Sequence, residues 1–164
     1  SREAHGQDSS VVKPPQLQGH ILEQTVLTED TNDKNVLHAI VKNLAELVAF
    51  KLRKRRQVAD KIRLEIHYTD GHQRIRTGRI IRIDDRSVFA VCRRLFDKAN
   101  ERRNRIRTIL LDVSNFRPYV NQKNLFPTAE IRNMAISKAV EKVRLKYGVR
   151  SLQTADVFQA LGRV

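Results

Sequence analysis

The chain has 164 residues, and its 32 Lys plus Arg against 18 Asp plus Glu give a formal net charge of +14. This length supports one domain with one hydrophobic core, and the single cysteine excludes a disulfide scaffold. The sequence has no run of about 20 uncharged apolar residues, so it predicts no membrane helix. Residues 1–18 are polar and do not have the pattern of a signal peptide. Because residue 1 is not methionine, we expect a piece of a longer protein.

The positive charge is concentrated in one part of the chain. Residues 51–107 carry 19 basic and 7 acidic side chains, whereas residues 1–50 are net acidic. Such a field attracts a polyanion and destabilises the fold by self-repulsion, so a polyanionic partner is favoured over a basic surface kept only for solubility. An anionic membrane is disfavoured, because no basic amphipathic helix exposes bulky apolar residues.

A flexible tail or linker is expected over residues 1–18, and a domain over 19–116. The first predicted element is a strand over 20–28. A helix follows, capped near Asp33, and its apolar stripe runs from Val36 to Leu52 in steps of three and four residues.

Strict alternation predicts a half-buried strand over 60–69, followed by an Asp-Gly turn and a return strand over 73–83 whose pattern slips at Gly78. A second helix is expected to begin at Asp84-Asp85, and a fourth strand over 105–113. The order strand-helix-strand-strand-helix-strand predicts an α+β fold. Its four-stranded sheet would carry two helices on one face and leave the other face bare.

The remaining residues are expected to form a connector over 117–128 and a C-terminal helical tail over 129–164. A helix over 129–147 should present one apolar side and end at Gly148. That side would hold Ile131, Ala135, Ala139, Val143 and Tyr147. A short last helix is predicted from Thr154 to Leu161.

Catalytic chemistry is not predicted for this chain. There is no glycine-rich phosphate loop or nucleophile elbow, and the five histidines lack metal-ligand spacing. Cys92 lies within an apolar helix stripe. The acid pairs Glu29-Asp30 and Asp84-Asp85 flank predicted helix starts, where capping explains them better than two-metal catalysis. We therefore expect no enzyme activity, metal, cofactor or small-molecule substrate for this chain by itself.

The bare sheet face is the strongest candidate for binding. Lys61, Arg63, Arg74 and Arg76 are expected to converge on it, with Thr77 and Arg79 beside them, and Gly78 would let a phosphate approach the backbone. Single-strand recognition would need exposed aromatics, and Tyr68, the only aromatic on these two strands, falls in the inward set. These residues favour backbone-directed binding of duplex DNA, with an unliganded charged face as the alternative.

A second candidate is the segment 122–126, Gln-Lys-Asn-Leu-Phe, which precedes Pro127 in the connector. An apolar pair on a loop held extended by proline is a form in which linear motifs enter a partner's groove. Local covering of the core is the other interpretation.

Several motifs together resemble the little-finger domain of Y-family DNA polymerases, the translesion enzymes of the DinB (polymerase IV) and UmuC type. The resemblance covers about residues 20–152. It is carried by residues 23–31 (EQTVLTEDT), 51–55 (KLRKR), 64–70 (LEIHYTD), 76–79 (RTGR), 122–126 (QKNLF) and 139–148 (AVEKVRLKYG).

The resemblance implies a domain that grips duplex primer–template across the major groove, mostly through the backbone. Arg76 and Arg79 match the family's hairpin arginines and Thr77 its small or hydroxyl residue, whereas Arg74 has no clear counterpart. Gln122, Leu125 and Phe126 match the anchors of a sliding-clamp motif. The magnesium-binding catalytic domains would precede this chain in a cytoplasmic, nucleoid-associated parent active in translesion synthesis, DNA repair and the SOS response. A stand-alone basic adaptor for RNA or DNA, without a polymerase parent, is the alternative function.

Overall fold

The computed structural model describes residues 19–119 and 128–162. The elements are β1 (Ile21–Thr31), α1 (Lys34–Lys54), β2 (Gln57–Tyr68), β3 (Gln73–Gly78), α2 (Asp85–Ala99), β4 (Ile106–Pro118), α3 (Thr128–Tyr147), a 3-10 turn (Val149–Ser151) and α4 (Ala155–Leu161). The predicted order of strands and helices is confirmed, and so is the α+β class. Among the residues that the structure describes, no helix is both long and apolar enough to cross a membrane.

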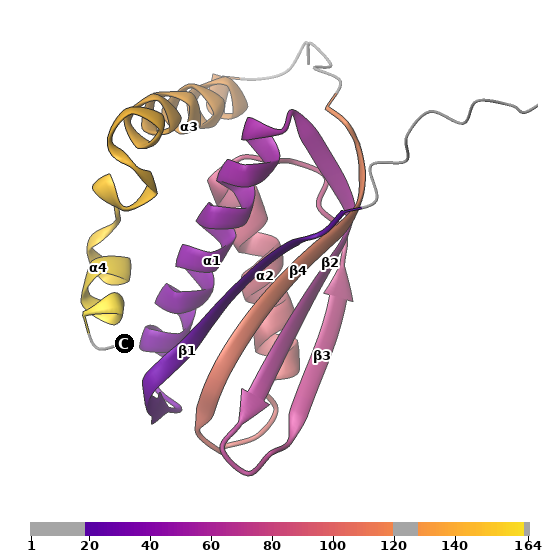
Figure 1. The fold of residues 1–164 in the computed structure, drawn as a ribbon, viewed down its shortest axis with the longest axis vertical. Coiled ribbons are helices and arrows are strands. Elements are labelled where there is room, and N and C mark those ends of the chain that lie inside the picture. The colour runs from indigo at the N-terminus through magenta and orange to yellow at the C-terminus, as the bar shows by residue number, and fades with distance from the viewer. Residues whose placement is uncertain (1–18, 120–127, 163–164) are drawn as a thin grey trace, which may run out of the picture.

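The four strands form one antiparallel sheet in the order β1-β4-β2-β3. The last strand of the chain thus lies inside the sheet, between β1 and β2. Helices α1 and α2 pack on one face of the sheet, and no described element covers the other face (Figure 1). We call these the helix face and the open face.

Side-chain caps fix where the two sheet-packed helices begin. The carboxylate of Asp33 accepts a hydrogen bond from the backbone N–H of Asn35, and Asp84 accepts one from the N–H of Ser87 at 2.9 Å. These bonds satisfy backbone donors that lack partners within the first turn. The last turn of α1 carries three cations, which complement the helix dipole.

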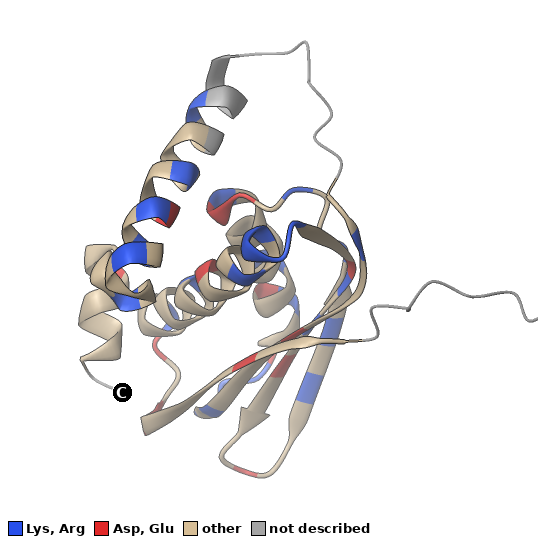
Figure 2. Cartoon of the chain, turned by 45° about the horizontal axis from the view of Figure 1, so that its top comes forward, with Lys and Arg blue, Asp and Glu red and all other residues tan. Residues whose placement is uncertain are grey.

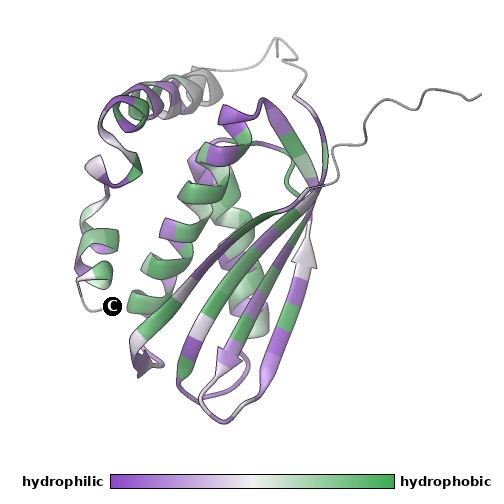
Figure 3. Ribbon diagram, viewed as in Figure 1, coloured by the Kyte–Doolittle hydropathy of each residue, from purple (hydrophilic) through white to green (hydrophobic). Residues whose placement is uncertain are grey.

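The core lies between the helix face and the two helices. The inward set predicted for β2 is confirmed, because Ile62, Leu64, Ile66 and Tyr68 are all buried. Apolar and polar residues alternate along the strands in the hydropathy colouring of Figure 3. The Tyr68 hydroxyl reaches the carbonyl of Ala99 at 3.3 Å, so its polar end is bonded inside the domain.

The return strand is shorter than predicted, because β3 ends at Gly78 rather than at residue 83. A Cβ at Gly78 would lie 3.3 Å from both methyl groups of Leu95, so α2 approaches the backbone closely there. Beyond Gly78 the chain leaves the sheet and buries Ile80 and Ile83 on the core side. The alternation slips at Gly78 because the strand ends.

The C-terminal helices dock on α1 through a buried arginine of α3 and through apolar side chains of α4. Arg144 of α3 bonds Glu46 of α1 at 2.5 Å and the carbonyl of Leu152 at 3.0 Å, and it lies 3.6 Å from Asp85. Arg53 of α1 in turn bonds Asp85 at 2.6 Å. Two more salt bridges start from α1: Arg53 pairs with Glu141 of α3, and Lys42 pairs with Asp156 of α4. Val157 and Ala160 of α4 are buried.

The apolar side predicted for α3 is not the side that this helix buries. Ala135, Ala139 and Tyr147 are exposed, whereas Ser137 and Arg144 are buried. The helix packs with a polar side because its partner, α1, offers Glu46 and Arg53 at that position rather than an apolar groove.

Candidate nucleic-acid interface

The open face is a regular grid of side chains from all four strands. Residues directly opposite each other in an antiparallel pair lie on the same face. The registers therefore place three rows on the open face: Leu22, Asp112, Arg63 and Thr77; Gln24, Leu110, Glu65 and Ile75; and Val26, Thr108, His67 and Gln73. Lys61 lies beyond the first row, opposite Ser114.

The middle of this face is nearly balanced in charge. Glu65 accepts bonds from its neighbours on β2, Arg63 at 2.6 Å and His67 at 2.7 Å, and Asp112 lies opposite Arg63 on β4. Apolar side chains are exposed among these charges, including Leu22, Val26 and Ile75. The expected basic sheet face is therefore mixed in its centre.

Arg74 and Arg76 are not where the sequence pattern predicts them. They pair with Ile66 and Leu64, so they lie on the helix face at the edge strand, apart from Lys61 and Arg63. Arg76 bonds Glu101, just after α2, at 2.6 Å. Gly78 also belongs to the helix face, where its close neighbour is α2.

Cations gather instead at the two ends of the sheet. One group, which we call the corner cluster, surrounds the passage from α1 into β2 and consists of Lys54, Arg55, Arg56, Lys61, Arg79 and Arg117. Arg79 and Arg117 both approach Asp60, at 3.7 and 2.9 Å, which partly neutralises them. Figure 2 shows the basic colour concentrated where α1 meets β2.

Two contacts position the part of the corner cluster that links α1 to β2. The Arg55 guanidinium lies 5.9 Å from the centre of the Phe116 ring, and the carbonyl of Arg56 accepts a 2.9 Å bond from the N–H of Tyr119. Arg56 has a φ of 51°, a backbone conformation that non-glycine residues rarely adopt. Lys54, Arg55 and Arg56 were not predicted as binding residues. The signal that could have found them is the basic run from Lys51 to Arg56.

The second group, the hairpin-end cluster, lies at the β2–β3 turn and consists of Arg102, Arg103, Arg105 and Arg107. Arg102 bonds Asp70 in the turn at 2.9 Å, and the N–H of Thr69 donates to the carbonyl of Arg105 at 3.0 Å. Hydrogen bonding to the His72 N–H is the largest cause that holds the pKa of Asp70 below its usual value, and Arg102 adds to it.

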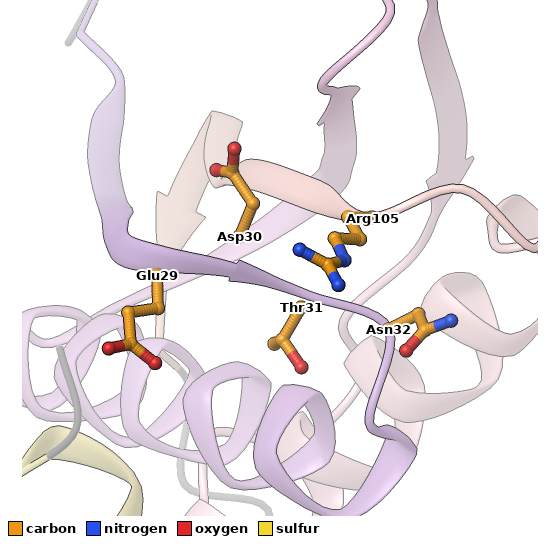
Figure 4. Close-up of a pocket in the computed structure, with 5 residues that line it drawn as sticks. All are labelled: Glu29, Asp30, Thr31, Asn32 and Arg105. Atoms are coloured by element: carbon orange, nitrogen blue, oxygen red, sulfur yellow. The ribbon is translucent and has the colours of Figure 1, made fainter.

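A shallow hollow beside this cluster does not form a metal site. It is lined by Glu29, Asp30, Thr31, Asn32 and Arg105, and the two carboxylates project from opposite sides of β1 (Figure 4). Asp30 instead pairs with Arg107 at 3.3 Å. Within residues 19–119 and 128–162, no group of three or more His, Cys, Asp or Glu side chains is arranged to hold a metal ion.

The interface therefore has two basic ends and a balanced middle. Ten residues of β4 separate Arg107 from Arg117, which is about 33 Å at about 3.3 Å per residue. That length is enough to place one cluster on each side of a major groove about 12 Å wide. The clamp-motif residues Gln122, Leu125 and Phe126 lie outside the described residues.

Comparison with known proteins places this architecture in a family. Residues 19–125 match the model of the impB/mucB/samB family C-terminal domain. The chain is 25% identical over 162 residues to DNA polymerase IV of Dehalococcoides mccartyi (strain CBDB1), covering 97% of this chain and 41% of that protein. DNA polymerase IV of the strain ATCC BAA-2266 / KCTC 15142 / 195 is also 25% identical, over 95% of this chain and 40% of its own length. The chain thus spans well under half of these relatives.

Among solved structures, the insertion ternary complex of Dbh DNA polymerase has the same fold, with a TM-score of 0.53 and 16% identity. The match covers 62% of this chain and 29% of that one. The family match over most of the domain confirms the resemblance drawn from the sequence motifs. The chain belongs to the impB/mucB/samB family as its C-terminal domain, the little finger of Y-family DNA polymerases.

Proposed function

We propose that this domain binds duplex primer–template DNA by laying its open face across the major groove. The observation that carries the proposal is an uncovered sheet face with a balanced middle and a basic cluster at each end. Phosphates on the two sides of the groove would contact the clusters, and the acidic Glu65 and Asp112 would stay over the groove, away from phosphates.

The proposed phosphate contacts differ among the predicted residues, because these side chains lie on different faces of the sheet. Lys61 and Arg63 lie on the open face, with Thr77 beside Arg63, and Arg79 is among the most exposed cations of the corner cluster. Arg74 and Arg76 would reach phosphates only around the β3 edge. For Gly78 we propose a positioning role, because its missing side chain lets α2 pack against β3.

The binding should tolerate any sequence. The open-face rows contain no Phe, Tyr or Trp on which a base could stack, and phosphate contacts carry no sequence information. Duplex RNA should bind more weakly, since its deep, narrow major groove does not admit a sheet. This difference separates the proposal from a stand-alone RNA-binding adaptor.

We assign the polymerase chemistry to parts of the parent protein outside this chain. The relatives named DNA polymerase IV are more than twice as long as the matched region, which leaves room for catalytic domains that use magnesium. Translesion synthesis during DNA repair is the proposed role of the parent, and DNA binding would place it at the nucleoid.

We propose further that Gln122, Leu125 and Phe126 anchor the domain to a sliding clamp. The support is the motif itself, which follows the sheet domain in the order typical of the family. A pull-down on an immobilised clamp, with Phe126→Ala beside Lys138→Gln as a matched surface control, tests this. Equal retention of the Phe126→Ala variant and the wild type would exclude the assignment.

The DNA proposal is tested by fluorescence anisotropy on primer–templates of two unrelated sequences at three salt concentrations. The Lys61→Gln/Arg63→Gln and Arg76→Ala/Arg79→Ala variants are compared with Lys138→Gln/Lys142→Gln on α3, which removes the same charge from a surface away from the sheet. We expect equal affinity for both sequences. The salt slope should fall by about 1 for each phosphate that the sheet variants no longer neutralise. Wild-type binding by both sheet variants would overturn the proposal.

A further inference from the structure

The outward side of α2 is a basic stripe that the sheet interface does not use. Arg86, Arg93, Arg94 and Lys98 are exposed there, with Ala90 between them. At 100° per residue these positions lie within one side of the helix, and Arg86 and Lys98 are about 18 Å apart along its axis. We call this set the α2 stripe.

Helix stability does not explain the α2 stripe. Arg86 lies in the first turn, where the helix dipole disfavours a cation, and Arg94 and Lys98 are like charges four residues apart. One acid, Asp97, lies on the same side of the helix among these cations, and it is engaged by His38 at 2.8 Å and by Arg93 of the stripe at 3.9 Å. Arg86, Arg94 and Lys98 make no ion pair within residues 19–119 and 128–162. Lys98, in the last turn, complements the helix dipole, whereas Arg86 and Arg94 keep their charge without a benefit to the helix.

The stripe is also uncovered and separate from the open face. The C-terminal helices pack on α1, whereas α2 packs against α1, β2 and β3 and leaves its outward side to solvent. Because α2 lies on the helix face, its outward side points away from the open face (Figure 1). A straight duplex on the open face cannot touch both surfaces.

We propose that the α2 stripe is a second binding site for the phosphate backbone of nucleic acid. Its charge complements phosphates, its spacing covers several of them along one strand, and Ala90 allows the backbone to come close. None of its exposed side chains is aromatic, so the contact would be to phosphates rather than stacked bases. The domain would thereby hold two segments of nucleic acid on opposite sides. The second segment is the single-stranded template overhang, because a straight duplex on the open face cannot reach the stripe, whereas a flexible single strand can turn around the domain.

The test compares two variants of equal charge on three DNAs. Arg86→Gln/Arg94→Gln/Lys98→Gln removes three of the four cations of the stripe, and Lys138→Gln/Lys142→Gln/Lys146→Gln removes three exposed cations from α3. The DNAs are a duplex of about one helical turn (about 10 base pairs), the same duplex with a single-stranded overhang, and a longer duplex. Affinity, stoichiometry and salt slope are measured for each.

We expect the two variants to match on the short and the longer duplex. They should differ on the DNA with the overhang, where the salt slope of the stripe variant falls by about 2 and the overhang is no longer bound. A deficit of the stripe variant on the longer duplex but not on the overhang overturns the assignment to a single strand. Equal behaviour of the two variants on every DNA overturns the inference. A larger deficit of the stripe variant on the short duplex overturns it too, because α2 would then belong to the first site. Failure of the open-face proposal is read separately, from the Lys61→Gln/Arg63→Gln variant on the short duplex.

Discussion

Replacing Arg144 with methionine should release the C-terminal helices from α1. The Arg144 side chain is 4% exposed, and its guanidinium bonds Glu46 at 2.5 Å and the Leu152 carbonyl at 3.0 Å. Methionine keeps much of the length but leaves the Glu46 carboxylate buried without its cation. Removing one partner of a buried ion pair destabilises by about 3–5 kcal/mol. We expect a loss of this size at neutral pH in the free energy that holds α3 and α4 in place.

The pH dependence separates the effect of charge from the effect of packing. Burial raises the pKa of Glu46, and the bond and charge of Arg144 oppose that rise, so the variant should have a still higher pKa. An acid whose folded pKa exceeds its unfolded value of 4.5 contributes stability at low pH that is lost as the pH rises through the folded pKa. The deficit of the variant should therefore be smallest below the unfolded value of 4.5 and grow as the pH rises above it.

Hydrogen exchange and urea unfolding measure this effect together. Exchange reports the opening of α3 and α4 separately from the sheet core, and urea reports global stability. Adding Glu46→Gln to the variant should restore most of the stability, since a buried pair replaced by neutral groups is often close to neutral in energy. A deficit below about 1 kcal/mol, the size of an exposed pair, or one that does not change with pH, would refute the reasoning.

Three further predictions concern single sites. Gly78→Ala should destabilise the domain by about 1–3 kcal/mol in urea unfolding, because its Cβ would lie 3.3 Å from two Leu95 methyl groups, whereas Gly19→Ala, with open space around it, should change little. Burial raises the pKa of the Cys92 thiol to about 12, so alkylation at pH 8 should be slow in the folded chain and fast in urea; fast labelling of the native protein would contradict its placement. Burial by itself would raise the pKa of Asp156, but hydrogen bonds, including one from a lysine of α1, outweigh it and lower the pKa from 3.8 to about 2. Its stabilisation, under about 1 kcal/mol because the side chain is half exposed, should be present above pH 3.8 and vanish as the pH falls toward 2, and Asp156→Asn should abolish this acid step in the exchange of α4.

Much of the fold could be predicted from the sequence, because β2, α1 and α2 each have one clearly apolar side. Strand β3 shows where this reasoning fails. Ile75 is its one large apolar residue, so the arginines were assigned to the bare face, yet Ile75 pairs with Glu65 on the open face. At an edge strand the helix face is only partly covered. The alkyl stems of Arg74 and Arg76 can lie there with their charged ends in water.

The sequence predicted a basic surface on the sheet, but it did not predict where on the sheet the cations gather. Arg117 is distant in sequence from Lys61 and Arg79, and only the pairing of β2 with β4 brings it to their end of the sheet. The docking of α3 could not be found from periodicity either, because a buried arginine looks like a solvent-exposed one until its partner on another helix is known.

The position of β4 also determines when this domain can form during synthesis. Strands β1 and β2 share no edge, and each pairs with β4, whose residues leave the ribosome more than 80 residues after β1 begins. Until then β1 has no strand to pair with, and one side of β2 stays open. A nascent chain stopped before Ile106 could form only the β2–β3 hairpin and its helices. We therefore expect the sheet to assemble late, in one step, as the sequence separation of its contacts implies.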